Sequence, residues 1–127
     1  MIKYFMNFLD SVSVCFKKYF IVKGRASRSE FWWFQLIWVV SYLFAILSNN
    51  NAISYFFFGI LIIIAIPLIT VGIRRLHDTN KSGFYFFFNF IPFIGALIYL
   101  AMMLPEGTKG KNKFGANPLI KIKKKRK

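Results

Sequence analysis

The stretch FWWFQLIWVVSYLFAILSNNNAISYFFFGILIIIAIPLITVGI, residues 31–73, decides the fold because it holds 43 consecutive residues without a formal charge. A membrane-spanning helix needs about 20 predominantly apolar residues, so this stretch is long enough for two spans. Its middle, SNNN at residues 48–51, is short, uncharged and typical of a turn. We therefore predict an antiparallel helical hairpin with spans over about 28–47 and 52–73.

Local signals fix the start of the first span and the shape of the second. Ser27 and Glu30 stand at the spacing of a capping box, in which each residue satisfies a backbone N–H of the other, so the first span should begin near Arg28. Pro67 lies inside the second span and has no N–H to donate. We expect a kink there and a carbonyl left free one turn earlier, near Ile63.

A third uncharged stretch, residues 82–105, is 24 residues long and is interrupted by Pro92 and Gly95. The 21 residues from 84 to 104 match the length of one more span, and this is the reading that we prefer. The alternative is a re-entrant hairpin that dips into the membrane and returns, which would leave backbone groups unpaired wherever it met lipid.

The rest of the chain flanks this membrane domain, which covers residues 23–118. Residues 1–22 form an amphipathic helix with Phe and Leu on one face and Lys on the other, suited to the membrane interface. Packing of this helix against the protein's own spans is an equally good reading, with Cys15 as an apolar filler. Residues 119–127 are a basic tail that we expect to be disordered.

The charge balance alone suggests nucleic acid, since 18 Lys and Arg residues against 4 Asp and Glu give a net charge of +14. The placement of the basic residues argues against that reading, because they lie outside the apolar stretches: 6 before the first span, none in the first loop, 3 in the second loop and 9 in the tail. We expect anionic lipid headgroups as the partner, and no nucleic acid.

The same counts bear on orientation. Three spans put 9 basic residues on each side, so the positive-inside rule gives a tie, whereas a re-entrant third segment puts all 18 on one side. We place the tail in the cytoplasm because its charges are the densest.

Two charged motifs, at 25–30 and 74–78, should meet at one end of the hairpin, because the start of the first span and the end of the second lie on the same side. We predict an interfacial charge cluster there, with an ion pair between Glu30 and an arginine of the second motif. Its members are Arg25, Arg28, Glu30, Arg74, Arg75, His77 and Asp78.

Four pieces of sequence together resemble a known family: GRASRSEFWW at 24–33, RRLHD at 74–78 with SG at 82–83, IPFIG at 91–95, and GTKGKNKFGANP at 107–118. Their order and spacing are similar to those of the small bacterial inner-membrane proteins called domain of unknown function 805. The resemblance implies a multi-span helical membrane protein and brings no established activity, cofactor or substrate.

The fold class predicted is an all-α integral membrane helical bundle, multi-pass in the bacterial inner membrane. We expect no catalytic residues, no cofactor and no metal ligands, since phosphate-loop, dinucleotide and paired-histidine motifs are absent from the sequence. The function predicted is a non-enzymatic structural or interaction module, with a homo-oligomer or a membrane-protein partner as possible assemblies. The alternative is a subunit of an oligomeric small transporter or channel.

Overall fold

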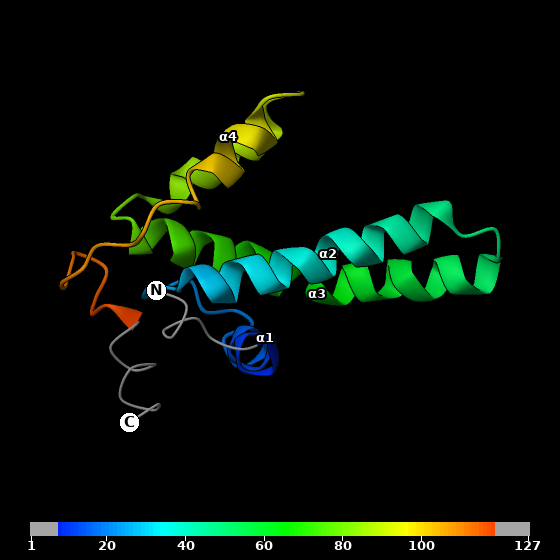
Figure 1. Ribbon diagram of the computed structural model, residues 1–127, viewed down its shortest axis with the longest axis horizontal. Helices are drawn as coiled ribbons and strands as arrows, with labels where there is room; N and C mark the ends of the chain where they lie inside the picture. Colours follow the sequence, from blue (N-terminus) through cyan, green and yellow to red (C-terminus); the bar gives the residue numbers. More distant parts are fainter. Residues whose placement is uncertain (1–7, 119–127) are drawn as a thin grey trace.

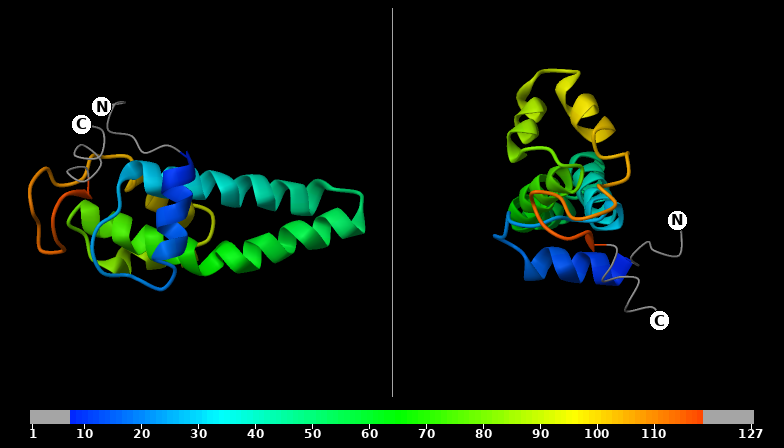
Figure 2. Two further views of the ribbon diagram at one scale, coloured as in Figure 1. Left: turned by 90° about the horizontal axis from the view of Figure 1, so that it is seen from below. Right: turned by 90° about the vertical axis from the view of Figure 1, so that its left-hand side faces the viewer.

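The computed structural model describes residues 8–118, and in that part of the chain the fold is all-helical, without a β-strand. Helices α2 (Arg28–Leu47) and α3 (Asn51–Asp78) form an antiparallel hairpin (Figure 1). Helix α1 (Phe8–Lys17) crosses this hairpin on one side. The 3₁₀ helix η2 (Gly83–Phe90) and the short helix α4 (Gly95–Ala101) lie on the opposite side (Figure 2). The predicted basic tail at 119–127 and the first seven residues of the predicted amphipathic helix lie outside the described residues.

Helix α2 begins and ends where the sequence predicts. The capping box is present: the Ser27 hydroxyl accepts from the Glu30 N–H at 3.4 Å, and the Ser27 N–H donates to Glu30 Oε2 at 2.7 Å. These bonds satisfy backbone groups that the first turn of a helix leaves unpaired. Helix α2 has 20 residues and is therefore about 30 Å long, which matches the thickness of the hydrocarbon core of a bilayer.

Helix α3 also begins as expected but runs five residues further than predicted. The Asn50 side chain caps its start by accepting from the N–H groups of Ala52 and Ile53, at 2.9 and 3.3 Å. The helix then continues past residue 73 to Asp78, so the motif RRLHD forms its last turn rather than a connecting loop. The charged side chains do not end the helix because, as shown below, most of them find partners in the protein.

The carbonyl freed by Pro67 is bonded. The helix passes through Pro67, which has no N–H for the carbonyl of Ile63, and the Tyr19 hydroxyl donates to that oxygen at 2.6 Å. The Thr70 hydroxyl lies within 3.2 Å of the Tyr19 carbonyl and 3.1 Å of the Pro67 carbonyl. The segment that follows α1 is therefore attached to the interruption in α3, which sequence analysis located at Ile63.

The third apolar stretch is not one helix. It forms η2, a turn over residues 91–94 in which Phe93 has a φ of 69°, and then α4. Two helices of the described chain, α2 and α3, are long and apolar enough to cross a membrane, and the continuous third spanning helix that we preferred is not found. Pro92 and Gly95 lie at the break, where a Cβ on Gly95 would overlap the Phe88 carbonyl.

Both ends of this stretch lie at the same end of the hairpin. It begins just after the Lys81 N–H has bonded the Leu76 carbonyl at 2.9 Å, and it finishes where Arg75 donates to the Met103 carbonyl at 3.3 Å. Between these two ends, the Tyr99 side chain packs closely on Gly72 of α3. A Cβ on Gly72 would collide with the Tyr99 hydroxyl. Residues 83–104 therefore leave the end of α3 and return to it.

Helix α1 packs against the protein's own spans through its small residues. Ser11 and Cys15 are fully buried, while Leu9 and Phe20, which we expected to lie on one apolar face, are 75% exposed. Phe16 contacts Phe34 of α2 with ring centroids 5.7 Å apart. Small side chains let helices approach closely, so they face the hairpin and the bulky side chains point outward.

The burial of Cys15 makes a prediction about its reactivity. Removal from water raises the pKa of the thiol to about 12, and the thiolate is the reactive form. We expect a maleimide at pH 8 to label Cys15 at least about 100-fold more slowly than an exposed cysteine. The control is Ser13→Cys in a Cys15→Ser background, because Ser13 is exposed on the same helix. Equal labelling rates would show that α1 is not seated on the hairpin.

Candidate functional site

The end of the hairpin opposite the 48–50 loop is closed by three segments that we call the polar cap: residues 24–30, 74–78 and 105–115. Backbone hydrogen bonds join them. The Ala26 N–H donates to the Arg74 carbonyl at 3.1 Å, and the Thr108 N–H donates to the Asp78 carbonyl at 2.8 Å. The loop after α4 thus folds over the ends of α2 and α3, as its path in Figure 1 shows.

Asp78 is the central residue of the polar cap. One oxygen of its carboxylate accepts from Arg25 Nε at 2.8 Å, and the other accepts from Arg75 Nη1. The two arginine side chains are 0% exposed and that of Asp78 is 5% exposed. Hydrogen bonds between ionised groups are stronger than neutral ones, and they gain further strength where water is excluded. A single carboxylate therefore joins the segment before α2 to the last turn of α3.

The two guanidinium groups complete their bonding with backbone carbonyls of the loop. Arg25 Nη1 donates to the carbonyls of Gly110 and Gly115, at 2.8 and 3.1 Å, and Arg25 Nη2 donates to that of Thr108. Arg75 Nη2 donates to the Pro105 carbonyl in the same way. The loop has no other secondary structure than the bridge between Asn112 and Gly115, so these bonds give it its shape.

Gly107 allows the loop to pass directly over the carboxylate. A Cβ built at this position would overlap the side-chain oxygens of Asp78. Gly110 lies three residues further along the same loop, and a Cβ there would meet nothing within 4 Å. The two glycines of the sequence GTKG therefore differ: the first is required by a close approach and the second is not.

His77 has partners other than its neighbour Asp78. Its Nδ1 lies 3.0 Å from the Gly24 carbonyl, and its ring stacks on that of Phe114 with centroids 4.0 Å apart. The Asn112 side chain donates to the His77 carbonyl at 3.0 Å. The imidazole thus helps to hold the loop on the helix end.

Glu30 does not form the ion pair that we predicted for it. Within residues 8–118 its carboxylate accepts the capping-box hydrogen bond, and no arginine lies within ion-pair distance. Asp78 takes that role instead, because it belongs to the last helical turn and lies between the two arginines. Arg28 pairs with Glu106 at 3.5 Å on the surface, where their side chains are 25% and 47% exposed.

Arg74 is the member of the predicted cluster whose side chain makes no hydrogen bond or ion pair in the described chain. It is 0% exposed, and its Nε, Nη1 and Nη2 have no hydrogen-bond partner there. It acts electrostatically on the Cys15 thiol of α1 and on the Glu30 carboxylate of α2.

Sequence reasoning missed the contribution of residues 105–115 to the polar cap. The acceptors for Arg25 and Arg75 are main-chain carbonyls, which any residue provides, so their identity carries no signal. Gly107 was the available clue, since a glycine is required only where the backbone approaches another group. In the described residues no group of three or more His, Cys, Asp or Glu side chains is placed to hold a metal ion.

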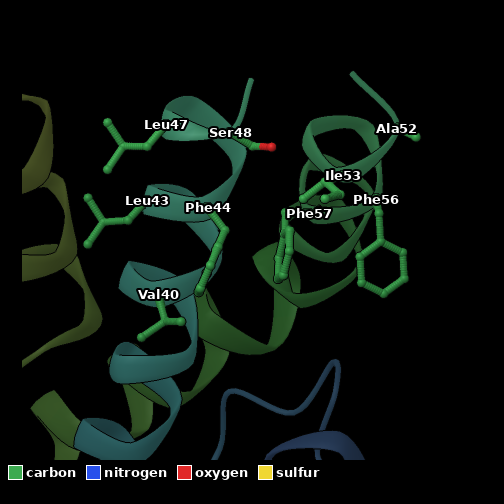
Figure 3. Close-up of a pocket in the computed structure, with 9 residues that line it drawn as sticks. All are labelled: Val40, Leu43, Phe44, Leu47, Ser48, Ala52, Ile53, Phe56 and Phe57. Carbon is green, nitrogen blue, oxygen red and sulfur yellow. The ribbon is translucent and has the colours of Figure 1, made fainter. Parts of the chain in front are cut away.

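A separate hollow of about 880 Å³ lies at the other end of the hairpin, between α2 and α3. Its lining is apolar except for Ser48, and Phe44 and Phe57 stack on each other in this lining with centroids 5.0 Å apart (Figure 3). No titratable side chain lines it, so it offers a surface for lipid chains and no group for acid or base chemistry.

The fold and the polar cap define a class: a small helical membrane protein whose two long apolar helices are closed at one end by buried, paired charges. Residues 19–116 match the family model described as "Protein of unknown function (DUF805)", and the chain belongs to this family. Its motifs at 24–33, 74–78 and 107–118 supply most of the polar cap.

Two proteins from Escherichia coli (strain K12) are similar to this chain in sequence. Inner membrane protein YhaI is 36% identical over 105 residues, which cover 80% of this chain and 89% of the relative. Inner membrane protein YhaH is 34% identical over 113 residues, which cover 82% and 92%. No solved structure matches the chain. The family description and these names state no enzymatic activity.

Loss of the charge on Asp78 should unfold the polar cap. The change Asp78→Asn keeps the shape of the side chain but leaves two buried guanidinium groups without an anion, which we expect to cost about 3–5 kcal/mol. The matched control is Glu106→Gln, which breaks an exposed pair and should cost less than about 1 kcal/mol. Thermal unfolding in detergent micelles measures both, and similar losses for the two variants would refute the central role of Asp78.

Addition of one methyl group should change the stability of the protein differently at the two loop glycines. We expect Gly107→Ala to destabilise the protein by about 1–3 kcal/mol, because its Cβ must displace the Asp78 carboxylate from the arginines. Gly110→Ala, with open space at its Cβ, should change stability by less than about 1 kcal/mol. The same thermal measurement applies, and equal effects would mean that the loop does not lie on Asp78.

Proposed function

We propose that the protein is a non-enzymatic module of the bacterial inner membrane, with two spans, a re-entrant hairpin at 83–104 and a cytoplasmic polar cap that rests on anionic headgroups. The observation that carries this proposal is the return of residues 83–104 to the end of α3. A segment that leaves and rejoins the same end of a helical hairpin does not need to cross the bilayer.

A re-entrant segment also removes the tie in the charge count. Every Lys and Arg of residues 8–118 lies before Phe31 or after Ile73, and the 48–50 loop carries no charge. With two spans, these basic residues belong to one side of the membrane. The positive-inside rule assigns such a side to the cytoplasm.

Internal bonds and protein contacts of residues 83–104 support the re-entrant arrangement against the objection that it exposes backbone groups to lipid. Most of the hairpin is helical, and the turn between η2 and α4 makes its own bonds, with the Ile94 N–H donating to the Pro92 carbonyl at 2.8 Å. The hairpin also packs on α3 through Tyr99 and Gly72. Irregular backbone at membrane depth is tolerated where such internal bonds and protein contacts support it.

Attachment to anionic lipid fits the chemistry of the exposed surface of the polar cap. Lys109 and Lys111 lie on its loop, and each basic residue near an anionic membrane surface contributes about 1 kcal/mol of attraction. Arg25, Arg75 and Asp78 are engaged in structural contacts with one another, and Glu30 and His77 with backbone groups. This use of the titratable side chains favours a structural or interaction role over catalysis.

The topology is tested by cysteine accessibility in intact cells, in a Cys15→Ser background. We expect a membrane-impermeant maleimide to label Asn49→Cys from the periplasm, and to label neither Lys81→Cys nor Lys111→Cys until the cells are opened. The last two positions precede and follow the third apolar segment. If one of them were labelled in intact cells and the other were not, residues 83–104 would be a full span and the proposed topology would be wrong.

A further inference from the structure

A fully buried charge without a partner lies between α1 and the hairpin. The Arg74 side chain is inaccessible to water, and none of its three nitrogens has a hydrogen-bond partner in the described chain. Arg25 and Arg75, in the same polar cap, share a carboxylate and several carbonyls. An ionised guanidinium is strongly destabilised by removal from water unless an anion or other acceptors replace the lost solvent.

The charge balance of the site points to an anion from outside the chain. Five ionisable side chains of the polar cap are at most 5% exposed: Arg25, Glu30, Arg74, Arg75 and Asp78. With both carboxylates ionised, three cations face two anions. Asp78 is shared by two arginines, and Glu30 is engaged by the Ser27 N–H. Arg74 acts electrostatically on Glu30, so the buried surplus of one positive charge belongs to the three arginines together, and Arg74 is the arginine whose guanidinium makes no hydrogen bond.

A second unpartnered donor faces the same interface from α1. The Ser11 hydroxyl is fully buried and has no hydrogen-bond partner in the described residues. Cys15 follows it by one helical turn on the same face, and its thiol lies beside Arg74 and donates to the Glu30 carbonyl at 3.8 Å. Two buried groups without a hydrogen-bond partner therefore lie between α1 and the hairpin, Arg74 beside Cys15 and Ser11 one helical turn before it. A phosphate group supplies several acceptor oxygens and a negative charge.

We propose that Arg74 and Ser11 bind the phosphate of an anionic phospholipid, with α1 as the movable cover of this site. Helix α1 lies across the hairpin near the start of α2 and the end of α3 (Figure 2), which is the level of lipid headgroups when α2 spans the bilayer. Its exposed Leu9 and the exposed Phe20 that follows it suit contact with acyl chains on either side of the headgroup. Arg74 is fully covered by the protein, so the phosphate enters as α1 moves outward.

This inference deepens the proposed function, since it names the site at which the anionic lipid binds. The test uses the full chain in a neutral detergent and does not depend on which side of the membrane the polar cap faces. Failure of the topology experiment and failure of this one are therefore distinguishable.

The measurement is the melting temperature with added phosphatidylglycerol at about 0.5 M NaCl, where surface attraction is screened and a buried contact is not. We expect saturating lipid to raise the melting temperature of the unchanged protein by several degrees. Arg74→Met should abolish this rise. Arg28→Met, which removes an exposed arginine, should keep it. Phosphatidylcholine and inorganic phosphate, added separately, should produce no comparable rise.

Several results would overturn the proposal. A rise that persists in Arg74→Met would place the lipid elsewhere. An equal rise with phosphatidylcholine would show that the site does not require a lipid with net negative charge. An equal rise with inorganic phosphate would identify a free anion rather than a lipid as the occupant.

An internal pair between Arg74 and Glu30 is the structural explanation to be excluded. If that pair balances the charge, Glu30→Gln and Arg74→Met should destabilise the lipid-free protein alike, and the proposal fails. If the site awaits an anion, Arg74→Met without lipid should be at least as stable as the unchanged protein, because it removes an uncompensated charge.

Ser11→Ala keeps the proposal falsifiable if Arg74→Met does not fold. We expect it to leave the lipid-free melting temperature unchanged and to raise the phosphatidylglycerol concentration needed for half of the shift about five-fold, the effect of one lost hydrogen bond. Ser13→Ala, on the exposed face of the same helix, should leave that concentration unchanged. Identical lipid dependence in the two serine variants would exclude Ser11 from the site.

Discussion

The structure depends on one carboxylate shared by two buried arginines. Asp78 is held at 2.8 Å by Arg25 and also by Arg75, with all three side chains almost inaccessible to water. The pair of Arg25 and Asp78 joins the segment before α2 to the end of α3, and Arg75, on the same helical turn as Asp78, holds the second carboxylate oxygen. The same arginines then collect the carbonyls of the loop at 105–115. Three segments that are distant in sequence are thereby fixed to one point.

This arrangement suits the surroundings of the protein. Lipid tails are as apolar as the side chains of α2 and α3, so burial from water does little to bring these helices together within a bilayer. Directional contacts and close fits must do so instead. The polar cap supplies them at one end, and further along α3 the contacts of Tyr99 with Gly72 and of the Tyr19 hydroxyl with the Ile63 carbonyl attach α4 and the segment after α1.

The features that the sequence predicts well are local ones. The capping box of Ser27 and Glu30, the start of α2 and the free carbonyl before Pro67 each follow from residues within one turn of each other. The partner of the arginines was predicted wrongly, because the choice between Glu30 and Asp78 depends on how far α3 extends and on a loop 30 residues later. Apolar length alone did not distinguish one helix from two over residues 84–104, and contact with α3 decides it.

The distance in sequence between Arg25 and its acceptors has a consequence for biosynthesis. Its guanidinium donates to carbonyls that lie 83 to 90 residues further along the chain. These carbonyls are therefore synthesised after both long helices and after Asp78, the residue that neutralises the charge of Arg25. Until residues 108–115 have been added, the Arg25 guanidinium lacks these three acceptors. A chain that stopped after α4 would keep the Arg25–Asp78 pair but would lack the loop that passes over it.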